Sequence, residues 1–156
     1  MEMYPLDIQD FNTRLSQEVL IGDGAMGTML YQRGVFLNAC FDELCLTRPD
    51  LITEIHTEYV KTGCDFIETN TFGANAVKLA HFGLTDKVNQ INKTAAQLAR
   101  KAAGDSTWVA GSIGPTGANN PHLNTEQHES AALAFTQQAQ ALASVGNSPL
   151  PTSPPA

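Results

Sequence analysis

Short apolar runs alternate with longer segments of helical periodicity along most of the chain. Each run is rich in β-branched or aromatic residues and ends in turn residues, which is typical of a strand. The predicted strands are Val19–Asp23, Asp65–Asn70 and Thr107–Ile113. Because short apolar strands that alternate with helices form βαβ units, the pattern predicts an α/β fold with parallel strands.

The segments between the predicted strands carry helix signals. Pro49 suits a first helical turn, and apolar residues follow it at helical spacing up to Gly63, which can end the helix. Val88 begins a second apolar face, which continues to Ala102 before Gly104. Further helices are predicted over Leu6–Gln17 and about Glu126–Ser144, with short helical turns after Met26 and Ala74.

The last twelve residues, Val145–Ala156, break this pattern. Four of the chain's eight prolines lie there, at positions 149, 151, 154 and 155. Proline interrupts helices and central strands, so we expect a Pro/Ser-rich disordered tail at 145–156 after a domain at 1–144. The tail stands where a fourth strand is expected. Premature termination, a shifted reading frame and a partial gene model all stay open as explanations.

Composition changes this picture mainly by excluding classes of protein. The chain has 156 residues, enough for one domain with a core. Nine Lys and Arg against sixteen Asp and Glu give a net charge of −7, which argues against nucleic acid and anionic membranes as partners. No apolar run approaches the ~20 residues of a membrane span, and the N-terminus does not resemble a signal peptide. Three cysteines, an odd number, favour reduced thiols and a cytoplasmic location.

The turn after the first predicted strand, GDGAMG at 22–27, matches the G-x-G-x-x-G pattern of nucleotide-binding sites. A dinucleotide site needs a second strand within ~30 residues, whereas the next predicted strand here begins at Asp65. Asp23 would also place a negative charge beside a phosphate. A small nucleotide-binding α/β domain that uses Gly22, Gly24 and Gly27 therefore stays only as an alternative.

A free amino acid suits the same turn better. The backbone N–H groups of Gly24, Ala25 and Met26 would point out of a strand-to-helix turn and could hold a carboxylate. Asp23 beside them could accept hydrogen bonds from an ammonium group. In the competing interpretation, the glycines only shape a tight turn and Asp23 caps the short helix.

Three motifs, taken together, connect the chain to a known family. They are GDGAMGT at 22–28, ETNTFGAN at 68–75 and GSIGPTG at 111–117. In these motifs, and over about residues 15–144, the chain resembles the homocysteine S-methyltransferase domain. That domain occurs alone, fused to a folate reductase, and as the first module of cobalamin-dependent methionine synthase. The resemblance implies a (β/α)8 TIM barrel, of which this chain would hold about three βα units and thus an incomplete barrel.

The resemblance also implies a site at the carboxyl ends of the strands, where all three motifs lie. In the family, the loop that matches Asp23 to Ala25 holds the backbone of homocysteine, and the loop that matches Thr69–Phe72 lines the pocket. Glu68 either fills the barrel interior or binds substrate. The candidate substrate-binding residues are Asp23, Gly24, Ala25, Met26, Glu68, Thr69, Asn70, Thr71 and Phe72.

The family's chemistry depends on zinc, which is held by three cysteines near the ends of later strands. Zinc deprotonates the substrate thiol, and the thiolate attacks a methyl group carried by methylcobalamin, S-methylmethionine or a similar donor. None of Cys40, Cys45 and Cys64 matches those ligands, so no metal site is expected in this chain. We expect His56 to be a surface or groove residue of its helix and His81 to lie at the surface.

Two functional hypotheses follow. In the first, the chain is a homocysteine S-methyltransferase-type domain that lacks the zinc ligands and is inactive alone. In the second, it is a non-catalytic chain that packs against a partner, such as the remaining barrel or a cobalamin or folate module, or that does not fold stably. The second hypothesis rests on open strand edges, where Val109 and Ile113 would face an incomplete interior.

Overall fold

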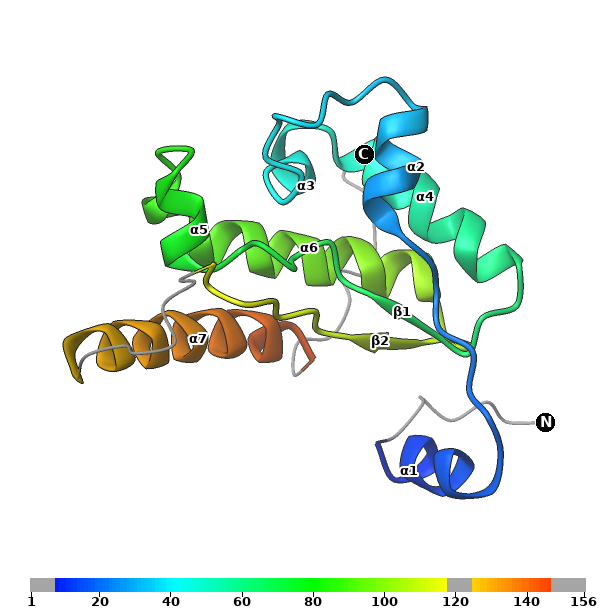
Figure 1. Ribbon diagram of the computed structural model, residues 1–156. Coiled ribbons are helices and arrows are strands. Elements are labelled where there is room, and N and C mark those ends of the chain that lie inside the picture. Colours follow the sequence, from blue (N-terminus) through cyan, green and yellow to red (C-terminus); the bar gives the residue numbers. More distant parts are fainter. Residues whose placement is uncertain (1–7, 118–124, 147–156) are drawn as a thin grey trace, which may run out of the picture.

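A computed structural model of the chain describes residues 8–117 and 125–146 (Figure 1). It shows an α/β arrangement in which helices outnumber strands. The elements are, in order, α1 (Ile8–Gln17), α2 (Met26–Gln32), α3 (Leu44–Thr47), α4 (Pro49–Lys61), β1 (Phe66–Glu68), α5 (Ala76–Ala80), the 3-10 turn η1 (Thr85–Lys87), α6 (Val88–Ala103), β2 (Trp108–Ala110) and α7 (Thr125–Gly146).

The sheet consists of β1 and β2, which pair in parallel with Phe66 opposite Trp108. The predicted strand over Val19–Asp23 is wrong as a strand. The chain there runs beside β1 but forms a single parallel bridge, between Gly22 and Phe66. Val19 is 89% exposed, so the outer side of this segment has little to pack against. The order and direction of the three segments nevertheless match the prediction.

The predicted helix boundaries are largely confirmed. Pro49 is the first residue of α4, and Gly63 follows its C-cap with a φ of 86°. Gly104 ends α6 with a φ of 56°, a backbone conformation that glycine adopts without strain. The last described helix, α7, continues to Gly146, two residues past the predicted end. The rest of the expected tail, 147–156, lies outside the described residues.

Helices pack along the sheet and leave the loops at the carboxyl ends of the strands accessible. Helix α6 packs against α4 on one side and α7 on the other, and it also contacts both strands. Leu30 of α2, Leu44 of α3, Ile52 and Ile55 of α4, and Ala95 of α6 share one buried cluster. Helix α1 lies at the amino end of the strands, away from the loops that follow them (Figure 1).

Candidate functional site

A cavity of about 910 Å³ lies at the carboxyl ends of the strands. Its wall comes from the turn before α2, the loop between α2 and α3, the loop after β1, the end of α5 and the loop after β2. All nine residues that the sequence analysis selected for substrate binding lie on this wall. The structure therefore brings together two motifs that are more than 40 residues apart in the sequence.

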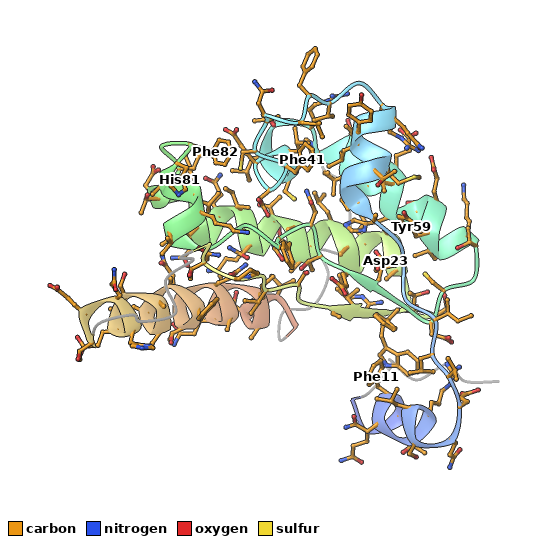
Figure 2. The ribbon with its side chains drawn as sticks, viewed as in Figure 1. Phe11, Asp23, Phe41, Tyr59, His81 and Phe82 are labelled. Atoms are coloured by element: carbon orange, nitrogen blue, oxygen red, sulfur yellow. The ribbon has the colours of Figure 1, made fainter. Side chains whose placement is uncertain are left out.

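Asp23 faces this cavity from the turn that leads into α2 (Figure 2). Its Oδ1 atom accepts a hydrogen bond from the backbone N–H of Glu68, at 3.1 Å. Burial raises the pKa of Asp23 to about 6, and the nearby charge of Glu68 also raises it, whereas the hydrogen bond from Glu68 N–H lowers it. Asp23 does not cap α2, because Ala25 is the N-cap residue and no side chain bonds to that end. The capping interpretation is therefore wrong.

Aromatic side chains approach the backbone of this turn closely, so the turn has little room for residues larger than glycine. A Cβ atom at Gly22 would lie 2.7 Å from the ring of Phe66, and one at Gly24 would lie 2.9 Å from the Tyr59 hydroxyl oxygen. Such short separations exclude any larger residue unless the ring moves. Packing accounts for Gly22 and Gly24, so these two glycines of the pattern give no specific support to a nucleotide site.

The same turn leaves hydrogen-bond donors free. Among residues 8–117 and 125–146, no acceptor bonds to the backbone N–H groups of Gly24, Ala25 or Met26. Gly24 and Ala25 are exposed and line the cavity. Free N–H groups beside a half-buried carboxylate can bind a small molecule that carries both a negative and a positive group.

The loop after β1 is held rigidly against the loop after β2. The hydroxyls of Thr69 and Thr71 are hydrogen-bonded at 2.6 Å. Thr69 Oγ1 also accepts a bond from Ser112 N–H, and Thr71 Oγ1 donates to the Ser112 carbonyl. Asn70 Nδ2 donates to the carbonyl of Phe41, at 2.7 Å. These polar side chains are buried and fix the shape of the cavity wall.

Glu68 and Phe72 stand at the exposed part of the same wall. Glu68 is exposed, and its Oε2 atom accepts a hydrogen bond from the Ser112 hydroxyl at 2.8 Å. Glu68 lines the cavity, which is compatible with both expectations for it. Phe72 is 58% exposed, and the ammonium group of Lys78 lies 5.1 Å from the centre of its ring.

Sequence analysis missed several residues of the cavity, and the clearest of them is Asp42. Its Oδ1 atom accepts a hydrogen bond from the backbone N–H of Gly73, at 3.0 Å. Burial raises the pKa of Asp42, while the Gly73 hydrogen bond lowers it. No spacing rule connects Asp42 with Gly73. Lys78 and Phe82 were also missed, whereas Ser112 lies in the GSIGPTG motif that was expected at this end of the strands.

The expectation for His56 was wrong. It is fully buried, and among the described residues neither ring nitrogen has a hydrogen-bond partner. Burial lowers its pKa to about 4. His81 is exposed, as predicted, and lies at the end of α5 and at the rim of the cavity (Figure 2).

The three cysteines are unpaired and buried. Cys45 Sγ lies 3.6 Å from the carbonyl oxygen of Asn70, and Cys64 Sγ contacts the carbonyl of Tyr59. Cys40 lines the cavity, whereas Cys45 and Cys64 do not. In the part of the chain that the structure describes, no group of three or more His, Cys, Asp or Glu residues could hold a metal ion. None of the described helices combines the length and hydropathy needed to cross a bilayer.

Comparison with known proteins connects this geometry to a family. Residues 20–148 match the family model described as homocysteine S-methyltransferase. The methionine synthases of Mycobacterium leprae and Mycobacterium tuberculosis are each 34% identical to the chain, over 142 and 149 residues. These matches cover 83% and 88% of the chain but only 12% of each relative.

Solved structures agree with the sequence relatives. The homocysteine methyltransferase MmuM from Escherichia coli, in its metallated form, matches with a TM-score of 0.72 and 26% identity. The match covers 87% of this chain and 54% of MmuM. The oxidized form of MmuM gives a TM-score of 0.73 at the same identity. The chain thus spans about half of this structural relative.

Proposed function

Because the chain belongs to the homocysteine S-methyltransferase family, we propose that its cavity binds homocysteine for transfer of a methyl group to the substrate sulfur. Since the chain spans only part of its relatives, the substrate, the methyl donor and the complete TIM barrel all belong to this proposal. A cytoplasmic location belongs to it as well. The proposal is supported most directly by one observation. The Asp23 carboxylate and the free N–H groups of Gly24 and Ala25 open onto one cavity.

Each part of that wall has a binding role in the proposal. Asp23 accepts hydrogen bonds from the substrate ammonium group, which would bring a positive charge to a carboxylate that burial now disfavours. The N–H groups of Gly24, Ala25 and Met26 donate to the substrate carboxylate. Phe72 is an exposed apolar side chain of the same wall and would cover the methylene groups that lead to the sulfur. Thr69, Asn70 and Thr71 act by holding the loop in place, and Glu68 adds negative charge beside Asp23.

The zinc ion that the family resemblance implies does not fit the residues described here. Cys45 and Cys64 bond to different carbonyl groups and do not share the cavity. No cluster of three metal ligands exists among the described residues. We therefore derive no step through a metal or cobalamin, and we assign these residues the binding and orientation of the substrate rather than a catalytic step.

A second candidate function has an observation of its own. Val19 and Ile21, on the segment beside β1, are 89% and 63% exposed. Apolar side chains at an open sheet edge are typical of surfaces that another chain segment covers. The chain would then act as a partner-dependent module, with the remaining barrel or a cobalamin or folate module as the partner. This function is compatible with substrate binding.

Titration calorimetry of the full chain with L-homocysteine tests the first proposal. We expect Asp23→Ala to weaken binding about tenfold or more, because it removes a charge-assisted hydrogen bond. Deamino-homocysteine, which keeps the thiol and the carboxylate, should bind wild type and Asp23→Ala equally. Asp50→Ala removes an exposed carboxylate of α4 and serves as the matched control. Equal homocysteine affinity in wild type and Asp23→Ala would contradict the role of Asp23.

A further inference from the structure

We propose that Asp42 is a positioning residue of the cavity, which fixes the loop Thr69–Gly73 through the backbone N–H of Gly73. The effect on ligand binding rests on the proposed function, whereas the contact between the loops does not. Asp42 lies in the segment between α2 and α3, and Gly73 lies 31 residues further on. The contact therefore joins two parts of the cavity wall that are distant in sequence.

The two groups are closely fitted. Asp42 Oδ1 lies 3.0 Å from the Gly73 nitrogen. A Cβ atom built at Gly73 would lie 2.6 Å from Asp42 Oδ2. Both carboxylate oxygens thus lie against the Gly73 backbone, and only glycine leaves room for them. The fit explains why the ETNTFGAN motif carries glycine at this position, although its φ is not positive.

A second bond joins the same loops in the opposite direction. The side chain of Asn70 donates to the carbonyl of Phe41, the residue before Asp42. Asp42 is itself anchored, because its carbonyl accepts the backbone N–H of Cys45 at the start of α3. With one bond at Asn70 and another at Gly73, the loop is held at both ends. A single bond would allow it to pivot.

The surroundings of Asp42 make its carboxylate depend on the hydrogen bond from Gly73 N–H. Its side chain is partly buried, and this burial raises its pKa. Among the described residues, no cation forms an ion pair with it, although the nearby charge of Lys78 lowers its pKa. Its hydrogen-bond donors include the Gly73 N–H, its own backbone N–H and, at 4.0 Å, the Cys40 thiol, which is a weak donor. A buried carboxylate needs such a donor, so the loop and Asp42 hold each other in place.

Amide hydrogen exchange, measured by NMR on the full chain without ligand, tests the contact between the loops. In Asp42→Ala, exchange at Gly73 should become about tenfold faster or more, because the acceptor is gone. Asp42→Asn keeps an oxygen acceptor and should restore protection to within about threefold of wild type. Glu43→Ala is the matched control, because Glu43 is the neighbouring carboxylate and does not line the cavity.

Calorimetric titration of the same variants with L-homocysteine tests the effect on the site. We expect Asp42→Ala to bind homocysteine about tenfold more weakly and Asp42→Asn to recover most of the affinity. If only the charge of Asp42 mattered, Asp42→Asn would bind as weakly as Asp42→Ala. Unchanged Gly73 exchange in Asp42→Ala overturns the proposal, as does an Asp42→Asn variant as defective as Asp42→Ala.

Two cases separate a failure of the proposed function from a failure of the role of Asp42. If wild type binds no homocysteine, the proposed function fails for this chain, and Gly73 exchange still decides whether Asp42 holds the loop. If Asp42→Ala does not fold, Gly73→Ala replaces it, because the added Cβ displaces the carboxylate from the other side. Faster exchange at Asn70 and Thr71 in Gly73→Ala then supports the proposal, and unchanged exchange overturns it.

Discussion

The pKa values of half-buried Asp23 and fully buried His56 shift in opposite directions. Burial raises the pKa of Asp23 to about 6 and lowers that of His56 to about 4. In both cases the neutral form is favoured, because a charge loses its water in the fold. Asp23 opens onto the cavity, where a bound ammonium group could restore the charged form. His56 has no such access, so its burial affects stability rather than binding.

His56 should make the chain sensitive to acid. Its folded pKa of about 4 lies below the ordinary value of 6.5, so the unfolded chain binds the proton more readily. The contribution to stability is therefore intact above pH 6.5 and is lost as the pH falls from about 6.5 to about 4. The loss should reach about 3 kcal/mol. Urea unfolding at a series of pH values measures it.

The comparison variant for this prediction is His56→Leu. It fills a similar volume and removes ring nitrogens that have no described partner, so we expect it to be at least as stable at pH 7. Asp23 opposes the effect over the same pH range, because its pKa is raised in the fold. The difference between wild type and His56→Leu isolates His56. His81→Leu alters an exposed histidine and should leave the pH dependence unchanged. Parallel curves for wild type and His56→Leu would refute the prediction.

How much of the site could be predicted depends on whether a residue acts locally. Asp23 and the Thr69–Phe72 loop were found because they lie in motifs at strand ends, and parallel strands bring those ends together. Asp42 acts on a backbone N–H 31 residues away, which no local pattern encodes. For His56 a signal was present. It follows Ile52 by four residues, so it lies on the buried face of α4.

At the scale of elements, α1 closes the amino end of the small sheet. Phe11 projects from α1 toward the strands (Figure 2). Its ring contacts Phe66 and Trp108 edge-on, with centroid distances of 6.0 and 5.3 Å. Arg14 pairs with Asp65 at 2.8 Å and lies over the Trp108 ring. Asp65 also accepts the backbone N–H of Ile21, at 2.9 Å. One carboxylate thus connects α1, the segment beside β1 and the start of β1.

Phe11→Ala should detach α1 and destabilise the chain by about 2 kcal/mol. This loss is smaller than that expected when a fully buried phenylalanine is truncated, because Phe11 is only partly covered. Leu15→Ala, on the same helix, is the control, since Leu15 is 55% exposed and should change stability little. Urea unfolding, followed by the fluorescence of the single tryptophan, Trp108, measures both variants. The prediction fails if the two variants lose equal stability.

Helices were predicted better than strands because their ends are encoded locally. Pro49, Gly63 and Gly104 mark helix boundaries through the backbone conformations that each residue favours. A strand depends on a neighbour that the local pattern does not supply. Val19–Asp23 has β-type residues, yet only Gly22 forms a bridge with β1. The prediction of three parallel segments in this order was sound, and the length of the first strand was not.

At the scale of the whole molecule, the candidate site and the exposed apolar edge of the sheet at Val19 and Ile21 lie on different parts of the fold. The cavity is formed by loops at the carboxyl ends of the strands. Val19 and Ile21 lie at the other end of the segment that leads to Asp23, beside the outer edge of β1. Because the two surfaces do not share residues, substitutions at the edge should leave homocysteine binding intact. Self-association and substrate binding can therefore be tested separately.

The exposed edge should make the chain self-associate as its concentration rises, because apolar side chains and free backbone groups at a sheet edge pair with other chains. We expect the double variant Val19→Lys and Ile21→Lys to remain monomeric, since lysine at an edge opposes such pairing. Size-exclusion chromatography with light scattering over a range of concentrations measures the mass. Leu133→Lys is the matched control, because Leu133 is 72% exposed but lies on α7. If Leu133→Lys abolishes association and the edge variant does not, association depends on α7, and the edge has no role in it.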